Sequence, residues 1–175
     1  MIPYSRQQIT EEDIKAVTDA LKDDILTGGQ KVSKFEDELA KYVGVKHVIA
    51  MNSATSALHV AYLSLGVKAG DEVITTPITF AATANAALMA GAQVKFCDVK
   101  ANGNIDEEKI PALITPKTKV LTAVDYGGNP VELDKIINLA KKHGIKVIDD
   151  ASHALGSVQN GVKVGVKADI SIFSF

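Results

Sequence analysis

Short apolar segments alternate with helix-forming segments along most of this chain, and that alternation restricts its fold more than any other feature. Continuous apolar runs, typical of strands buried on both faces, occupy residues 71–77, 93–99, 119–126 and 145–152. The segments that precede or separate them end near glycines, as helices do, at residues 53–66, 78–91 and 131–144. The pattern predicts an α/β fold in which a mainly parallel sheet carries helices on both faces.

Local signals predict the remaining elements. Five further elements complete the prediction: helices at residues 10–24, 33–44 and 104–114, and strands at 47–52 and 168–175. Thr10 is the expected N-cap of the first helix, and Ser33 with Glu36 has the pattern of a capping box for the second. Pro111 weakens the third helix, because proline lacks the backbone donor that a helix interior needs.

The composition excludes several classes of protein. The chain has 175 residues and a formal net charge of -2, which gives no electrostatic argument for nucleic-acid binding. A single cysteine, Cys97, excludes an internal disulfide. The longest apolar run, residues 76–94, is interrupted by Pro77 and Asn85, so we do not expect it to span a membrane. We expect a cytoplasmic protein without a membrane or nucleic-acid partner.

Two stretches after predicted strands suggest a ligand site, because ligands of parallel sheets bind beyond the carboxyl ends of the strands. Small and hydroxyl residues at 53–56 open a helix, whose free backbone N–H groups can hold a phosphate. Ordinary N-capping by Ser53 or Thr55 explains them equally well. Phe80 lies just after another strand, where its ring either packs in the core or stacks on a flat ligand.

The stretch KVIDDASHALG, residues 146–156, places two carboxylates at the end of an apolar strand. A buried carboxylate needs a partner, which is either a helix N-terminus or a cationic ligand such as a protonated ring nitrogen. His153 follows Asp150 by three residues and either faces the same site or is an ordinary histidine. Ser174 ends the last predicted strand, where its hydroxyl either completes a phosphate site or has no special role.

Taken together, these side chains suit one kind of ligand. An anion cradle, a flat apolar surface, an acid and a hydroxyl at one sheet edge match a flat anionic cofactor with a protonated ring nitrogen, and pyridoxal phosphate is such a molecule. A nicotinamide cofactor is not indicated, because the first strand-to-helix turn lacks G-x-G-x-x-G.

The chain resembles the DegT/DnrJ/EryC1/StrS family of sugar aminotransferases over essentially its whole length. The resemblance is carried by ILTGGQKVSKFEDELAKYVGVKHVIAMNSATSALHVA, GDEVITTPITFAATANAALMAGA, VDYGGNPVELDKI, IDDASHALGS and ADISIFSF. It implies the large domain of a pyridoxal-phosphate enzyme of fold type I, the aspartate-aminotransferase-like fold. TPITFAATANAALMAGA and NSATSALH are most similar to the branch of pseudaminic acid biosynthesis. That branch implies transfer of an amino group from glutamate to C4 of a UDP-linked 4-keto-6-deoxy sugar.

The resemblance also implies roles for individual residues. Ala54, Thr55 and Ser174 match the family's phosphate-binding positions, and Phe80 matches the aromatic that stacks on the pyridine ring. Asp150 matches the acid that keeps the ring nitrogen protonated.

Five further positions match the family less closely. His153 stands beside the cofactor's phenolic oxygen by resemblance, whereas Asp149 receives no catalytic role. Tyr4, Gly28 and Gly29 are expected to line the sugar-nucleotide pocket.

The resemblance does not extend to the lysine that carries the cofactor covalently as a Schiff base, which in this family follows the last strand of the chain. Lys163 and Lys167 precede that strand, at its wrong end. We therefore expect residues 1–175 to be an incomplete, inactive large domain, truncated at the C-terminus, without the small C-terminal domain. The intact protein is expected to be a homodimer. A sugar dehydratase, in which histidine replaces the lysine, and a non-catalytic phosphate-binding module stay open as alternatives.

Overall fold

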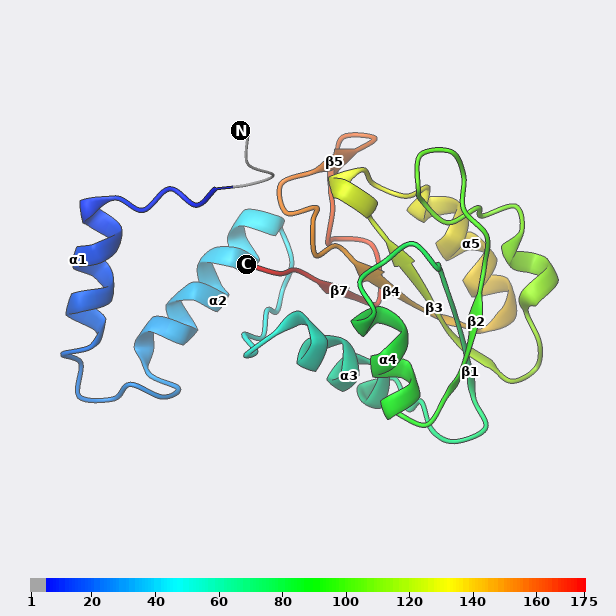
Figure 1. The fold of residues 1–175 in the computed structure, drawn as a ribbon, viewed down its shortest axis with the longest axis horizontal. Coiled ribbons are helices and arrows are strands. Elements are labelled where there is room, and N and C mark those ends of the chain that lie inside the picture. Colours follow the sequence, from blue (N-terminus) through cyan, green and yellow to red (C-terminus); the bar gives the residue numbers. More distant parts are fainter. Residues whose placement is uncertain (1–5) are drawn as a thin grey trace.

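A five-stranded, wholly parallel sheet forms the centre of the protein (Figure 1). The computed structural model describes residues 6–175. The strands lie in the order β2-β1-β3-β4-β7. Their bounds are Gln93–Phe96 for β2, Glu72–Thr75 for β1, Thr118–Val124 for β3, Lys146–Asp150 for β4 and Ile170–Ile172 for β7. The predicted class, a parallel α/β sheet, is confirmed.

Helices cover both faces of the sheet, as the sequence predicts. Helices α3 (Ala54–Ser64) and α4 (Ala82–Met89) pack on one face, and α5 (Leu133–His143) packs on the other. Neighbouring strand residues point to opposite faces, so the three central strands, β1, β3 and β4, each contribute to two cores. The core under α3 and α4 contains Val73, Val120 and Ile148, and the core under α5 contains Ile74, Leu121 and Val147.

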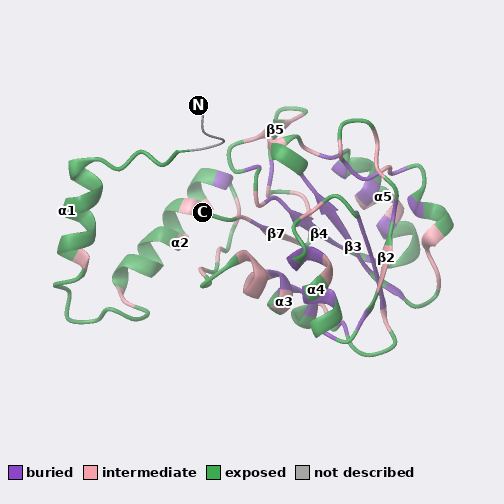
Figure 2. Ribbon diagram, in the orientation of Figure 1, coloured by how far each residue is buried: buried purple, intermediate pink, exposed green. Residues whose placement is uncertain are grey.

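The two N-terminal helices project away from the sheet (Figures 1 and 2). Helix α1 (Glu11–Ala20) contains no buried residue, and α2 (Gln30–Val43) buries only Val43. Thr10 caps α1 as predicted, in a reciprocal capping box with Asp13. Helix propensity and N-capping therefore stabilise α1, whereas packing against the core stabilises the helices that cover the sheet.

Two predictions for the N-terminal third are wrong. Residues 47–52 form no strand, because an apolar run becomes a strand only beside a partner edge, and here Ile49 is 80% exposed. The capping box of Ser33 and Glu36 does not form either, since α2 begins one turn earlier with Gly29 as its N-cap. Glu36 instead accepts a hydrogen bond from the Ala50 N–H at 2.8 Å, which ties α2 to the segment that was expected to be a strand.

Several boundaries also differ from the prediction. The short helix near Pro111 is a single 3-10 turn, Ile110–Leu113, and the last strand is confined to β7. The apolar run 76–94 is divided among a loop, α4 and β2, and no helix within residues 6–175 is long and apolar enough to cross a membrane. A small hairpin of β5 (Val158–Gln159) and β6 (Val162–Lys163) and a 3-10 turn, Tyr126–Gly128, were not predicted.

Tyr62 joins the sheet to both helices on its face, and we expect its hydroxyl to stabilise the fold. The fully buried hydroxyl donates to the Thr83 carbonyl of α4 at 3.0 Å and lies 2.8 Å from Thr122 Oγ1 of β3. Tyr62→Phe preserves the ring but leaves the buried Thr122 hydroxyl without its hydrogen-bond partner and removes one hydrogen bond to the Thr83 carbonyl. The free energy of unfolding is expected to fall by about 1–3 kcal/mol, measured by urea denaturation.

Tyr126→Phe is the matched control, because Tyr126 is 44% exposed. Its stability is expected to change by less than about 0.5 kcal/mol. Equal stability of the two variants would contradict a structural role for the Tyr62 hydroxyl.

Candidate active site at the carboxyl edge of the sheet

The carboxyl ends of all five strands lie along one edge, because every strand pairing is parallel. Helix α3 directly precedes β1 and runs from the carboxyl edge of the sheet to its amino edge. The N-terminus of α3 therefore lies at the carboxyl edge. The strand order also reverses between β1 and β3, since the chain first moves to β2 and then crosses back. Such a switch point is where open α/β sheets bind their ligands.

Asp150 is the last residue of β4 and is held by hydroxyl groups. Only 4% of it is exposed. Its Oδ2 accepts a hydrogen bond from Thr83 Oγ1 at 2.7 Å, and its Oδ1 accepts from Ser152 Oγ at 2.6 Å and from Ser152 N at 3.4 Å. All three donors are uncharged. The carboxylate is therefore oriented without being neutralised, which suits a site for a positively charged ligand group.

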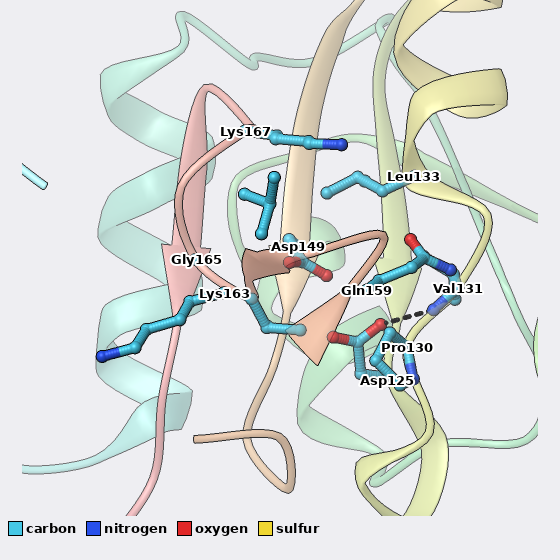
Figure 3. Close-up of a pocket in the computed structure, with 11 residues that line it drawn as sticks. Asp125, Pro130, Val131, Leu133, Asp149, Gln159, Lys163, Gly165 and Lys167 are labelled. Atoms are coloured by element: carbon cyan, nitrogen blue, oxygen red, sulfur yellow. Dashed lines mark hydrogen bonds between the residues drawn. The ribbon is translucent and has the colours of Figure 1, made fainter. Parts of the chain in front are cut away.

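Asp149 precedes Asp150 on β4 and points to the opposite face of the sheet, where it meets Asp125 (Figure 3). Asp149 is fully buried, and neither of its carboxylate oxygens has a hydrogen-bond partner among the described residues. Asp125 accepts from the Val131 N–H at 2.8 Å through Oδ1. Both acids line a cavity of about 20 Å³ beneath the β5–β6 hairpin, which is room for roughly one water molecule.

Burial dominates the electrostatics of this acid pair. It raises the pKa of Asp125 to about 6, with a further contribution from the charge on Asp150. Burial also raises the pKa of Asp149 well above its ordinary value, and the neighbouring carboxyls of Asp125 and Asp150 add to the shift. Two adjacent buried carboxyls cannot both ionise readily, so their burial favours the protonated form of each.

The N-terminus of α3 offers backbone donors at the same edge. Ser53 is the N-cap and accepts from the Ser56 N–H at 3.1 Å, so the capping interpretation is correct. Capping leaves the N–H groups of Ala54 and Thr55, in the first turn, without an intrahelical acceptor. Both residues are half-buried. An anion-binding role for Ala54 and Thr55 is compatible with this geometry and stays a prediction.

Three other predicted residues also follow strands at this edge. Phe80, between β1 and α4, is 78% exposed, which contradicts the alternative that its ring packs in the core. Ser174 is exposed two residues beyond β7. His153 is exposed in a turn three residues beyond β4, where no helix follows the strand. The fold thus brings Phe80, His153, Ser174 and Asp150 to the carboxyl edge of the sheet.

The expected sugar-nucleotide residues are placed differently. Gly28 and Gly29 lie in the turn between α1 and α2, away from the sheet (Figure 1). A Cβ on Gly29 would lie 2.5 Å from the Ile25 carbonyl oxygen, so the turn itself requires a glycine there. The chain as described gives these glycines a local structural role. Tyr4 lies outside the described residues.

Three residues that the sequence did not single out help to build the site. Thr83 and Ser152 hold Asp150, and Gly128 allows the loops after β3 and β4 to touch. Gly128 has a φ of +81°, and a Cβ there would lie 2.8 Å from the His153 carbonyl oxygen. A threonine among the alanines of α4 could have indicated a polar contact made by Thr83. The sequence does not indicate which strand that side chain faces.

The parallel sheet with helices on both faces and a buried acid at its carboxyl edge is the large-domain fold of the pyridoxal-phosphate-dependent aminotransferases of fold type I. The structure superposes on an aminotransferase of *Helicobacter pylori*, PseC, described as involved in the biosynthesis of pseudoaminic acid, with a TM-score of 0.96 and 43% sequence identity. It also matches the pyridoxal-phosphate form of a sugar aminotransferase, Spr1654, of *Streptococcus pneumoniae*, with a TM-score of 0.95 and 32% identity. The alignments cover 99% of this chain and 47% and 48% of those proteins.

Sequence comparison gives the family directly. The DegT/DnrJ/EryC1/StrS aminotransferase family matches residues 7–175, so the chain belongs to that family. A UDP-4-amino-4,6-dideoxy-N-acetyl-beta-L-altrosamine transaminase of *Campylobacter jejuni* is 61% identical over 100% of this chain, which spans 47% of that relative. The *Helicobacter pylori* transaminase of the same name is 44% identical over 98% of this chain and 46% of its own length. The chain thus spans about half the length of the curated relatives it matches.

The acid pair predicts a pH dependence of stability. Both pKa values are raised in the folded protein, so between about pH 4 and pH 6 the native state binds more protons than the unfolded chain. The stabilising contribution is full below the unfolded pKa and is lost as the pH rises through the folded pKa. Asp149→Asn removes one titrating group. At pH 7.5 we expect it to be about 1–3 kcal/mol more stable than the wild type, with a flatter dependence on pH, by urea denaturation.

Asp169→Asn provides the control with the opposite sign. Partial burial acts to raise the pKa of Asp169, but hydrogen bonds from Lys146 and the Val147 N–H outweigh it and lower the pKa. Its contribution is lost as the pH falls, so this variant should keep the wild-type slope above about pH 5. If Asp149→Asn also kept that slope, the acid pair would not titrate as described.

Proposed function

We propose that the protein binds pyridoxal 5'-phosphate at the carboxyl edge of the sheet and acts as a nucleotide-sugar aminotransferase. The observation that carries this proposal is Asp150, a buried carboxylate held by three uncharged donors at the end of a central strand. A carboxylate accepts about four hydrogen bonds, so one further donor can be accommodated. A protonated pyridine nitrogen supplies both that donor and a compensating charge.

The surrounding residues fit the rest of the cofactor. The N-terminus of α3, with Ala54 and Thr55, offers backbone donors for the phosphate, and the Ser174 hydroxyl is proposed to add another. The exposed ring of Phe80 is available to stack on the pyridine face. His153 is proposed to contact the phenolic oxygen. When bound, the cofactor supplies the electron sink for removal of the substrate's α-proton, and Asp150 keeps its ring nitrogen protonated.

The substrate proposal rests on the relatives. Their names specify a transaminase that acts on a UDP-linked amino-dideoxy sugar. We propose the same chemistry for the protein to which this chain belongs, with glutamate as donor and C4 of a UDP-linked 4-keto-6-deoxy sugar as acceptor. A cytoplasmic homodimer, a small C-terminal domain and a covalent lysine beyond Phe175 belong to this proposal. Tyr4, Gly28 and Gly29 stay candidates for the sugar-nucleotide pocket in such an assembly.

The lysines before β7 have other partners in the structure. Lys163 donates to the Tyr42 carbonyl, and its ammonium group lies 4.0 Å from the centroid of the Tyr42 ring. Lys167 pairs with Asp134 at 2.7 Å, on the α5 face of the sheet. Neither ammonium group is hydrogen bonded to or ion paired with Asp150, which supports placing the covalent lysine elsewhere in the protein.

A protein consisting of residues 1–175 is therefore expected to show no amino transfer and no lysine adduct at a defined site. The measurement is intact mass and peptide mapping after incubation with pyridoxal phosphate and reduction with borohydride, which traps a lysine-bound cofactor. The mass should stay at the 18.5 kDa of the chain. A longer protein that contains these residues should acquire one adduct, beyond Phe175, and transfer an amino group from glutamate to the UDP-sugar.

Other outcomes would support different functions. Turnover by verified 175-residue material, or an adduct at one site within it, would contradict the proposal. Cofactor binding by the longer protein without any lysine adduct would favour the sugar dehydratase, in which histidine replaces the lysine. Correct folding of the longer protein without cofactor binding would favour a non-catalytic module.

A further inference from the structure

We propose that Thr83 is a positioning residue for the aminotransferase reaction, which fixes the carboxylate of Asp150 in the orientation that the cofactor's ring nitrogen requires. This inference rests on the proposed function. Thr83 lies in the second position of α4, outside β4, and is fully buried. Its hydroxyl lies 2.7 Å from Asp150 Oδ2, the oxygen that receives no other donor within the described residues.

The direction of the hydrogen bonds follows from counting protons. An ionised carboxylate can only accept, so the single hydroxyl proton of Thr83 goes to Asp150. Thr79 Oγ1, at 2.7 Å from Thr83 Oγ1, must then donate to Thr83. The Thr83 hydroxyl thus has a donor behind it and an acceptor in front of it, which leaves it one stable orientation.

Thr83 is itself fixed from the other side. Its carbonyl accepts the Tyr62 hydroxyl proton at 3.0 Å, so Thr122 Oγ1 must donate to Tyr62 at 2.8 Å. These bonds connect α4 to α3 and to β3 next to Asp150. A residue held at both its side chain and its carbonyl within a rigid core is able to hold a catalytic group accurately.

The two carboxylate oxygens are held differently. Ser152 binds Oδ1 through its hydroxyl and backbone N–H, from the turn that directly follows β4. Thr83 alone binds Oδ2, and it comes from a helix rather than from the same turn. Without Thr83, the carboxylate would be held through Oδ1 only and could rotate about its terminal bond. Oδ2 also keeps acceptor capacity for one further donor. We assign that capacity to the ring nitrogen.

The test separates an effect on the ring nitrogen from a general effect on the site. The dissociation constants of pyridoxal phosphate and of its 1-deaza analogue, in which a C–H group replaces the ring nitrogen, are measured by calorimetry on the full-length apo protein. Both ligands carry the same aldehyde and phosphate, so covalent attachment and phosphate binding cancel in the ratio. Thr83→Val is expected to weaken binding of pyridoxal phosphate roughly 5- to 30-fold and binding of the analogue less than about twofold.

Thr75→Val is the matched control, because it removes an equally buried hydroxyl, which donates to the Thr122 carbonyl and is hydrogen bonded to neither Thr83 nor Asp150. It should change both dissociation constants by the same factor. Thr83→Ser retains the hydroxyl and should restore the wild-type ratio. If Thr83→Val does not fold, Ser152→Ala removes the other hydroxyl donor to Asp150 and should lower the preference for pyridoxal phosphate in the same way.

Asp150→Asn distinguishes failure of this inference from failure of the proposed function. If the wild type prefers pyridoxal phosphate and Asp150→Asn removes that preference, the proposed role of Asp150 stands. An unchanged ratio in Thr83→Val would then overturn the positioning role alone. If the wild type binds both ligands equally, or binds neither, the proposed function fails and the inference fails with it.

Discussion

The end of β4 is the constraint on which the rest of the structure depends, because it buries two consecutive carboxylates in the middle of a parallel sheet. The alternation of a strand sends Asp149 and Asp150 to opposite faces. Within residues 6–175, neither acid forms an ion pair with a lysine or arginine, so each face must accommodate its acid in another way. The two faces do so differently, and the difference separates the candidate active site from the purely structural side of the sheet.

On the α3–α4 face, two hydroxyl groups and a backbone N–H donate to Asp150, which leaves the carboxylate able to accept one further hydrogen bond. On the α5 face, Asp149 has no donor within the described residues and meets Asp125 across a small cavity. A buried acid without a donor or a cation is most stable when protonated. Burial thus favours the protonated form of Asp149, whereas Asp150 is held by hydrogen-bond donors on the face where a cationic ring is proposed to bind.

Much of this arrangement could be predicted from sequence, because it depends on local patterns. The apolar runs predicted β1, β3 and β4. Parallel pairing of these strands then predicted that Asp150, Phe80 and Ser174 lie at one edge. The contacts that orient Asp150 were not predictable, since Thr83 is 67 positions away and sequence gives no register between α4 and β4. Residues 47–52 were mistaken for a strand for the same reason. Apolarity is local, whereas a strand also requires a partner edge. Glu36 likewise has a local capping pattern with Ser33, but its carboxylate instead accepts a hydrogen bond from the N–H of Ala50, 14 residues away.

The hydrogen bonds that stabilise the fold and those that orient the candidate catalytic acid belong to one network. Thr122 of β3 is hydrogen bonded to Tyr62 of α3, and Tyr62 donates to the backbone carbonyl of Thr83 in α4. The side chain of the same threonine donates to Asp150, so Thr83 belongs to both sets of hydrogen bonds. A change in the packing of α3 against the sheet therefore moves the residue that holds Asp150. The position of the Asp150 carboxylate therefore depends on the core beneath it, because tightly packed interiors resist small displacements. The core hydroxyls thus link the stability of the sheet to the geometry of its carboxyl edge.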